Sequence, residues 1–324
     1  MKKSTKIIIS FVAIIVLVIG AIIGINNITK NHEKISIVAT NFPAYDFARA
    51  VAGDKADIKL LIKPGAETHD FEPTPSDIID IKNSKFFVYT GGESDEWIED
   101  ILSDIDVKKT KLIKMMDSVE VVEEETVEGM EHEHEHEHEY EHEEDEEEIE
   151  YDEHVWTSLK NAQKIVNKIK DELVQISPEH KDDFEKNAEE YNEKLNKLDK
   201  EFEEIVENGN RKVVVFGDRF PLRYFVEDYG LKYFAAFSGC SEQTEASSKT
   251  IAFLVNKVKS EKIPVVLKIE MSNGNIARTI AEETGAKVLT FNTAHNVSAD
   301  DFRNGKTYAK IMEDNLVVLK EALK

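Results

Sequence analysis

The sequence predicts an α/β fold with two α/β lobes, mostly parallel sheets and one long backbone helix bridging the lobes. Three observations predict it. Short β-rich runs alternate with helical patterns early in the chain, the same alternation returns after residue 210, and a glycine-free stretch with helical periodicity lies between them. Beyond its first 30 residues, the 324-residue chain is long enough for two globular domains.

The first lobe is assigned to residues 31–120. Runs rich in β-branched and aromatic residues predict strands at 35–40, 58–62 and 86–90, and a helical pattern covers 41–51. Alternation of strand and helix is typical of a parallel sheet.

A long linking helix is predicted over residues 154–209. Its apolar residues recur at helical spacing in two runs, Leu159, Ile165, Ile169 and Leu173, followed by Phe184, Tyr191, Leu195, Leu198 and Phe202. Pro178 interrupts the pattern, since proline is tolerated only in the first turn of a helix. The stretch is therefore expected to be a kinked helix or a pair of helices.

The second lobe is assigned to residues 210–324. Elements are expected to alternate again between strand and helix along residues 212–216, 224–229, 235–237, 250–260, 265–269, 275–284, 288–291 and 307–323.

Residues 1–30 are interpreted as a membrane anchor or signal segment. Residues 7–25 contain no charge and are long enough to cross a bilayer as a helix. Lysines 2, 3 and 6 precede them, which predicts a cytoplasmic N-terminus and an extracytoplasmic body at the cell membrane. An uncleaved anchor is expected, and cleavage after Ala21 or Gly24 is the alternative. The only cysteine is Cys240, so neither a disulfide nor a lipid-modified cysteine beside this segment is expected.

Residues 121–153 form an acidic insert with alternating histidines. Nineteen acidic residues and no lysine or arginine lie between positions 123 and 153, and they carry most of the formal net charge of −24. The segment cannot build an apolar core, but imidazoles beside carboxylates suit zinc and similar metals. It is predicted to be an auxiliary metal-collecting loop through His132, His134, His136, His138 and His142. Because the chain has no basic surface to follow a phosphate backbone, a nucleic-acid partner is not expected.

Two further histidines occupy positions where ligands are commonly bound. His69 follows a predicted strand, at the edge where open α/β sheets bind ligands, and His154 stands at the head of the linking helix. Residue chemistry alone leaves two interpretations open for each: a metal ligand, or a surface or capping residue.

Together these segments resemble a known family. The motif PGxxxHxFEPxPSD at residues 64–77, the acidic His-rich insert, HVWTSLxNA at 154–162 and SGCSEQTE at 238–245 occur in the order found in metal-binding receptors of ABC importers for zinc and manganese, the ZnuA/TroA-like group. The resemblance covers residues 35–324. It implies metal in the cleft between the two lobes, His69 and His154 as ligands, and an ABC permease as partner.

The chain departs from that family pattern at two positions. The third ligand position falls on Arg219, whose guanidinium has no lone pair to give, and Asp218 beside it would need a shifted backbone. The fourth position falls near residues 292–295, where there is no aspartate. Candidates for the missing ligands are Glu270, Cys240 and His295.

Three residues are expected to support the ligands. Arg219 is predicted to hold a carboxylate in place, with Asp218 or Glu270 as its partner. Glu245 matches a family glutamate that supports the cleft.

The predicted function is metal binding, not catalysis. The HExxH matches in the chain fall inside the His-Glu repeat, outside the helix that this motif requires. Imidazole and thiolate candidates favour Zn²⁺, with Mn²⁺ as a possible cargo of the same kind of receptor. The alternatives are a manganese receptor, a surface-anchored metal buffer or adhesin without a permease, and a metalloenzyme. A monomer is expected.

Overall fold

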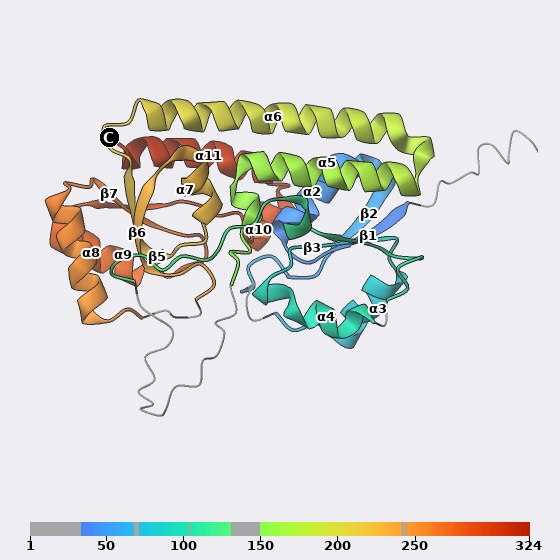
Figure 1. The fold of residues 1–324 in the computed structure, drawn as a ribbon, viewed down its shortest axis with the longest axis horizontal. Helices are drawn as coiled ribbons and strands as arrows, with labels where there is room; N and C mark the ends of the chain where they lie inside the picture. Colours follow the sequence, from blue (N-terminus) through green and yellow to red (C-terminus); the bar gives the residue numbers. More distant parts are fainter. Residues whose placement is uncertain (1–33, 68–70, 104, 131–149, 242, 244) are drawn as a thin grey trace, which may run out of the picture. The chain divides into compact units, whose positions relative to one another are not determined.

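Two four-stranded sheets form the framework of the part of the chain that the structure describes (Figure 1). The structure is a computed structural model, and it describes residues 34–67, 71–103, 105–130, 150–241, 243 and 245–324. Within those ranges no helix combines the length and apolarity needed to cross a membrane. The predicted anchor at residues 7–25 lies outside them.

The first lobe is a sheet with strand order β2 (Ala56–Leu60), β1 (Ile35–Ala39), β3 (Phe86–Tyr89), β4 (Lys111–Lys114). β3 runs parallel to both β1 and β4, with Val38 opposite Phe87. Its helices are α2 (Phe42–Ala52), α3 (Pro75–Asn83) and α4 (Glu96–Leu102). β4, α3 and α4 were not among the predicted elements, and β2 begins and ends two residues before the predicted strand.

Helix α2 begins and ends one residue after the predicted helical pattern. The side chain of Asn41 accepts a hydrogen bond from the backbone N–H of Ala44 at 3.2 Å and so caps the helix. Pro43 lies in the first turn, where its missing N–H costs nothing. The apolar side of α2, including Phe47 and Val51, is buried.

The second lobe is a fully parallel sheet with strand order β6 (Lys232–Phe237), β5 (Val213–Arg219), β7 (Val265–Lys268), β8 (Lys287–Thr290). Its helices are α7 (Arg223–Tyr229), α8 (Ser248–Ser260), α9 (Asn275–Thr284), α10 (Ala299–Arg303) and α11 (Tyr308–Ala322). β5 runs three residues past its predicted end, so Arg219 is the last residue of the strand. Gly217 lets α9 approach this strand closely, since a Cβ there would lie 2.5 Å from the Cα of Ala277.

The linking stretch is a pair of helices, one of the two arrangements that the sequence left open. α5 (Leu159–Ile176) ends at Ser177, and a 3₁₀ turn, Pro178–His180, leads into α6 (Lys181–Glu207). α6 packs against α5 and α2 near the first lobe and against α11 and α7 in the second. With 27 residues it is about 40 Å long at 1.5 Å per residue, so this one helix reaches both lobes.

A buried polar contact joins α2, α6 and α11. Asp46 of α2 accepts hydrogen bonds from the hydroxyl of Tyr191 on α6 at 2.8 Å and from the backbone N–H of Tyr308 at 2.9 Å. Tyr308 in turn donates its hydroxyl to the carbonyl of Trp156 at 2.5 Å. Buried carboxylates need such partners, and here the partners fasten helices of both lobes to one another.

Candidate metal centre

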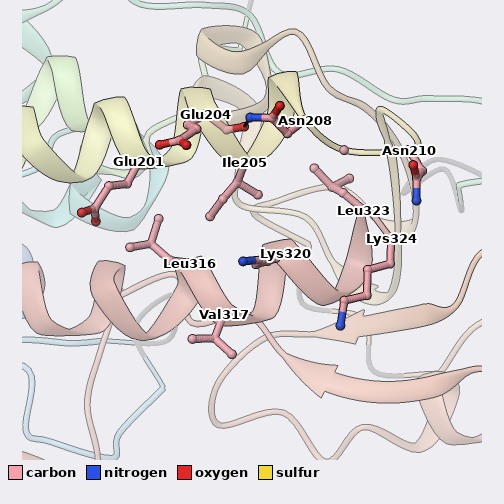
Figure 2. Close-up of a pocket in the computed structure, with 11 residues that line it drawn as sticks. Glu201, Glu204, Ile205, Asn208, Asn210, Leu316, Val317, Lys320, Leu323 and Lys324 are labelled. Atoms are coloured by element: carbon pink, nitrogen blue, oxygen red, sulfur yellow. Dashed lines mark hydrogen bonds between the residues drawn. The ribbon is translucent and has the colours of Figure 1, made fainter.

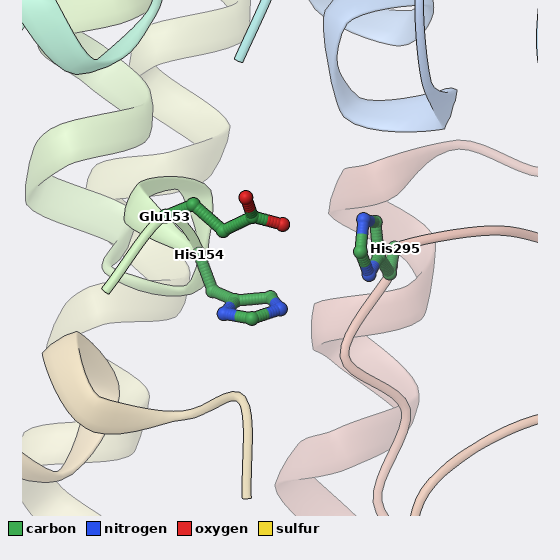
Figure 3. A group of neighbouring side chains, drawn as sticks. All are labelled: Glu153, His154 and His295. Atoms are coloured by element: carbon green, nitrogen blue, oxygen red, sulfur yellow. The ribbon is translucent and has the colours of Figure 1, made fainter. Parts of the chain in front are cut away.

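Glu153, His154 and His295 form a group of potential metal ligands (Figure 3). One ligand atom from each lies within 4.8 Å of those from the other two, and all three residues are buried. The two imidazole rings are 5.2 Å apart between centroids and nearly perpendicular, at 88°. Imidazole nitrogen and carboxylate oxygen are both ligands that zinc accepts, so this group can bind a metal ion.

His154 is held from both its backbone and its ring. It directly precedes the 3₁₀ turn Val155–Thr157 that leads into α5. Asp152 Oδ1 accepts the backbone N–H of His154 at 2.7 Å and lies 3.1 Å from its Nδ1. A carboxylate at Nδ1 favours the tautomer in which Nε2 carries the lone pair, and Nε2 is then the ring atom suited to bind metal.

Glu153 is positioned by the first lobe. Its carboxylate accepts hydrogen bonds from the backbone N–H of Ser94, at 2.9 Å, and from the Ser94 hydroxyl. Gly92, with φ of 84°, passes so close that a Cβ there would lie 2.7 Å from the Cβ of Glu153. The turn after β3 therefore needs glycine at this point for the carboxylate to fit beneath it.

His295 lies in the loop after β8, and Glu270 organises that loop. The Glu270 carboxylate accepts hydrogen bonds from the backbone N–H of Thr293 at 2.6 Å, the Thr293 hydroxyl at 2.7 Å and the backbone N–H of His295 at 3.1 Å. Trp156 donates its indole N–H to the Thr293 carbonyl at 2.9 Å, and its ring lies 4.8 Å from that of His295. Glu270 thus supports the backbone of the loop and lies outside the group of three.

Burial and neighbouring charges oppose one another in this group. Burial lowers the pKa of His154, but Asp152, Glu153 and Glu124 raise it more, so that its pKa lies above the usual value. Burial raises the pKa of Glu153, although His154 and Ser94 act against this. A metal cation would relieve both effects, because it replaces the proton on the imidazole and offsets the buried negative charge.

Two segments flanking residues 131–149 dock on the second lobe, and we call them the stem (residues 121–130 and 150–153). Glu123 and Tyr151 form an antiparallel bridge, and Asp152 N–H donates to the Val122 carbonyl at 2.9 Å. The Tyr224 hydroxyl donates to the Asp152 carbonyl at 2.6 Å. The predicted loop histidines, His132, His134, His136, His138 and His142, lie outside the described residues.

Cys240 lies beside the stem. Glu124 Oε1 accepts the backbone N–H groups of Gly239 at 2.9 Å and Cys240 at 3.2 Å. Burial, reinforced by Glu153, Glu124 and other carboxylates, raises the pKa of the Cys240 thiol well above its usual value. The thiol therefore keeps its proton at neutral pH. Cys240 is half-buried and lies outside the group of three.

The residues predicted to support the ligands lie in different surroundings. Arg219 holds a carboxylate, but its partner is Glu67, 3.3 Å from Nη2, in place of Asp218 or Glu270. Asp218 instead accepts the backbone N–H of Arg219 at 2.9 Å, and burial raises its pKa. Glu245 is exposed on the segment before α8. His69 lies outside the described residues.

Sequence reasoning missed Glu153 as a member of the group. It is the last residue of the acidic run, in which only the histidines were predicted to bind metal, and its surroundings include Gly92 and Ser94 some 60 positions earlier in the chain. Its position directly before His154 was the only local signal.

Two cavities differ in what they can hold. A small cavity of about 30 Å³ adjoins His295 and Glu270, and this is enough space for an ion or a water molecule. A larger cavity of about 570 Å³ lies between α6 and α11, lined by residues such as Ile205, Leu316 and Lys320 (Figure 2). It is separate from the metal-ligating side chains.

The amino-acid sequence is similar to those of known zinc-binding proteins. The family model for ZnuA, described as "Zinc-uptake complex component A periplasmic", matches residues 37–322. The zinc-binding lipoprotein AdcA of Streptococcus pneumoniae strain R6 is 34% identical over 300 residues, which are 93% of this chain and 58% of the relative. The chain thus spans little more than half the length of that protein.

A second relative matches at nearly full length. The high-affinity zinc uptake system protein ZnuA of Bacillus subtilis strain 168 is 33% identical over 291 residues, 90% of this chain and 88% of the relative. Among solved structures, the Zn(II)-bound ZnuA-like domain of Streptococcus pneumoniae AdcA superposes with a TM-score of 0.73 at 33% identity, covering 90% of this chain and 99% of that domain.

Proposed function

The chain belongs to the ZnuA family of zinc-uptake components, and from that premise we propose that it is an extracytoplasmic zinc receptor serving an ABC importer. Its activity is metal binding and not catalysis, as in the family. The observation that carries the proposal is the buried group of Glu153, His154 and His295.

The proposed ligands are His154 and His295, Glu153, and His69 as a fourth. Three of them already lie within ligand range of one another, and zinc is satisfied by four ligands at roughly 2.0–2.3 Å. His69 is proposed from its motif alone. Cys240 is the alternative fourth ligand, because its backbone is held beside the same group by Glu124.

Zinc is proposed over manganese on ligand chemistry. Manganese prefers carboxylate-rich octahedral oxygen sites, whereas two buried imidazoles and an available thiol suit zinc. The name of the Bacillus subtilis relative states zinc uptake, which supports the same choice.

The remaining parts of the proposal concern the chain's surroundings. We propose that residues 7–25 anchor the monomeric protein to the cell membrane, that an ABC permease receives the metal, and that residues 131–149 collect metal beside the cleft. The stem supports the last point, since it joins that segment directly to Asp152 and Glu153, next to His154.

The test combines binding with physiology. Purified full-length protein in detergent should carry close to one zinc per chain, and calorimetric titration after metal removal should give a much lower Kd for Zn²⁺ than for Mn²⁺. Disrupting the gene in its host should impair growth under zinc limitation, and added zinc should restore it. A preference for Mn²⁺, or a growth defect that only manganese corrects, would refute the zinc assignment.

A further inference from the structure

The turn at residues 63–66 is fastened to the opposite lobe at a point outside the metal ligands. Pro64 and Gly65 occupy its central positions, Gly65 has φ of 86°, and Ala66 N–H donates to the Lys63 carbonyl at 3.0 Å. Proline followed by a glycine with positive φ is the signature of a type II turn, so this segment has a defined shape of its own. It belongs to the first lobe and leads toward His69.

Asn296 of the second lobe binds both ends of that turn. Its side-chain Nδ2 donates to the Lys63 carbonyl at 3.0 Å and to the Ala66 carbonyl at 2.8 Å, while its Oδ1 accepts the backbone N–H of Val297 at 2.8 Å. The residue is only 3% exposed. Only an amide side chain supplies two donors and an acceptor in this way, and aspartate at the same position would face two carbonyls with no hydrogen to donate.

Arg219 of the second lobe makes another contact with the first lobe, through Glu67. Its Nη2 lies 3.3 Å from Glu67 Oε2, and its Nη1 donates to the Ser241 carbonyl at 3.3 Å. The Glu67 side chain is 46% exposed, so this ion pair is screened by solvent and contributes less than the buried Asn296 contacts.

These contacts lie beside His295, one of the three potential ligands. Ala66, Glu67, Arg219 and Asn296 line the same small cavity as His295. Asn296 also directly follows His295 in the chain, so movement of the turn and movement of that histidine are mechanically connected.

We propose that Asn296, assisted by Arg219, is a metal-independent clasp that holds the turn at residues 63–66 against the second lobe. The inference rests on the proposed function in one respect, that the cavity beside His295 is where metal enters and leaves. The clasp closes the cleft through protein–protein hydrogen bonds, so it prepares the site before metal arrives and must open for metal to leave. Asn296 and Arg219 are thus positioning residues that govern the rate of metal release.

The first experiment measures the clasp without any metal. Hydrogen exchange of the amides of residues 61–67 is followed in the metal-free full-length protein and in Asn296→Asp, with Asn304→Asp, an exposed asparagine of the same lobe, as control. Exchange in this segment should rise about 10-fold in Asn296→Asp, the effect expected from losing hydrogen bonds of ordinary strength, and should stay unchanged in the control. Unchanged exchange in Asn296→Asp overturns the clasp.

The second experiment measures metal release. Stopped-flow transfer of zinc to a chelator should be about 10-fold faster from Asn296→Asp, while the association rate changes little, because the ligands themselves remain. Faster exchange with an unaltered release rate would refute the role in release and leave the clasp itself standing. If wild-type protein binds no metal tightly, the proposed function fails, whereas the exchange result still decides the clasp.

If Asn296→Asp does not fold, the contact between Arg219 and Glu67 tests the clasp through variants at exposed or half-buried positions. Arg219→Gln and Glu67→Gln each remove one half of the exposed ion pair, with Arg219→Lys retaining the charge. Both Gln variants should raise exchange at residues 61–67 by a smaller factor, their double variant should add little more, and Arg219→Lys should restore part of the protection. Additive effects of Arg219→Gln and Glu67→Gln would contradict a shared contact.

Discussion

Asp152 holds His154 twice with one oxygen: Oδ1 accepts the backbone N–H at 2.7 Å and lies 3.1 Å from Nδ1. Only Glu153 lies between them in the chain. Three consecutive residues thus supply the carboxylate that orients the histidine, Asp152, and two potential ligands, Glu153 and His154. The end of the acidic run is therefore part of the candidate metal centre.

Replacing Asp152 with asparagine should weaken zinc binding by about 10- to 100-fold, as expected when the group orienting a metal-bound histidine is altered. Loss of the carboxylate also removes one of the neighbours that raise the pKa of His154, so proton competition for the imidazole should shift to lower pH. Zinc affinity measured from pH 5 to 8 checks both effects. Glu150→Gln, exposed at the start of the same stem segment, is the control, and equal effects of both changes would show general electrostatics instead of orientation.

The variant Glu153→Gln distinguishes a role of this residue in zinc binding from a role in the stability of the fold. If the carboxylate binds metal, zinc affinity should fall by more than about 10-fold, the size of effect seen for residues that support or form a metal site. Burial raises the pKa of Glu153, so its charge is costly in the metal-free state, and removing that charge should leave the metal-free melting temperature unchanged or higher. Titration and thermal unfolding of the same samples test this, with Glu123→Gln as control. A lower melting temperature with unchanged affinity would assign Glu153 a structural role only.

Trp156 provides an optical report on the two histidines. Its ring lies 5.3 Å from that of His154 and 4.8 Å from that of His295. Zinc should therefore alter its fluorescence with a one-to-one endpoint, and the double change His154→Ala and His295→Ala should abolish both signal and tight binding. The chain has two tryptophans, so Trp97→Phe should keep the signal and Trp156→Phe should lose it. His180→Ala is the histidine control, and tight one-to-one binding by the double variant would disprove the ligand assignment.

Asp95 should make the stability of the metal-free protein depend on pH. Burial raises its pKa from 3.8 to about 7, so between about pH 4 and 7 the native state binds a proton that the unfolded chain has released. Stability from this residue is complete below pH 4 and declines toward pH 7, by at most about 1.4 kcal/mol per pH unit. Denaturant unfolding of wild type and Asp95→Asn across this range should show the slope reduced in the variant. Asp106→Asn, an exposed aspartate, should retain the wild-type slope, and so should Asp95→Asn if this explanation is wrong.

The loop histidines can be tested without disturbing the stem. Changing His132, His134, His136, His138 and His142 to glutamine keeps the chain length, the carboxylates and the Glu123–Tyr151 bridge. The tight site should remain, and weaker sites that titrate near the ordinary histidine pKa of about 6.5 should disappear. Calorimetry with excess zinc at pH 5.5 and 7.5 measures both classes. Loss of the tight site would mean that one of these histidines supplies a ligand.

Much of the fold follows from local pattern, whereas the site depends on distant contacts. Long apolar periodicity located α5 and α6, and Pro178 marked their junction. The short elements β4, α3 and α4 carry too few residues for a clear period, and each has a single buried residue, Ile113, Ile81 and Ile98 respectively. Position and chemistry made His154 and His295 candidates.

Other features of the site left no local trace in the sequence. The partner of Arg219 is Glu67, 152 positions away, and only the folded chain brings them together. Burial of Glu153 likewise comes from a turn of the first lobe. Asn296 stood beside a candidate ligand, yet nothing nearby in sequence indicated that its amide would bind carbonyls of residues 63 and 66.

The helix shared by both lobes bears on how a transport partner could tell a loaded receptor from an empty one. α6 packs on α2 and on α11, and Asp46 ties these three helices through Tyr191 and Tyr308, so a wide hinge motion would have to break buried polar contacts. Metal binding is then expected to change the conformation of the loops beside the candidate site, above all the turn at residues 63–66. A permease would then distinguish the loaded receptor by the conformation of these loops, and not by the angle between the two lobes.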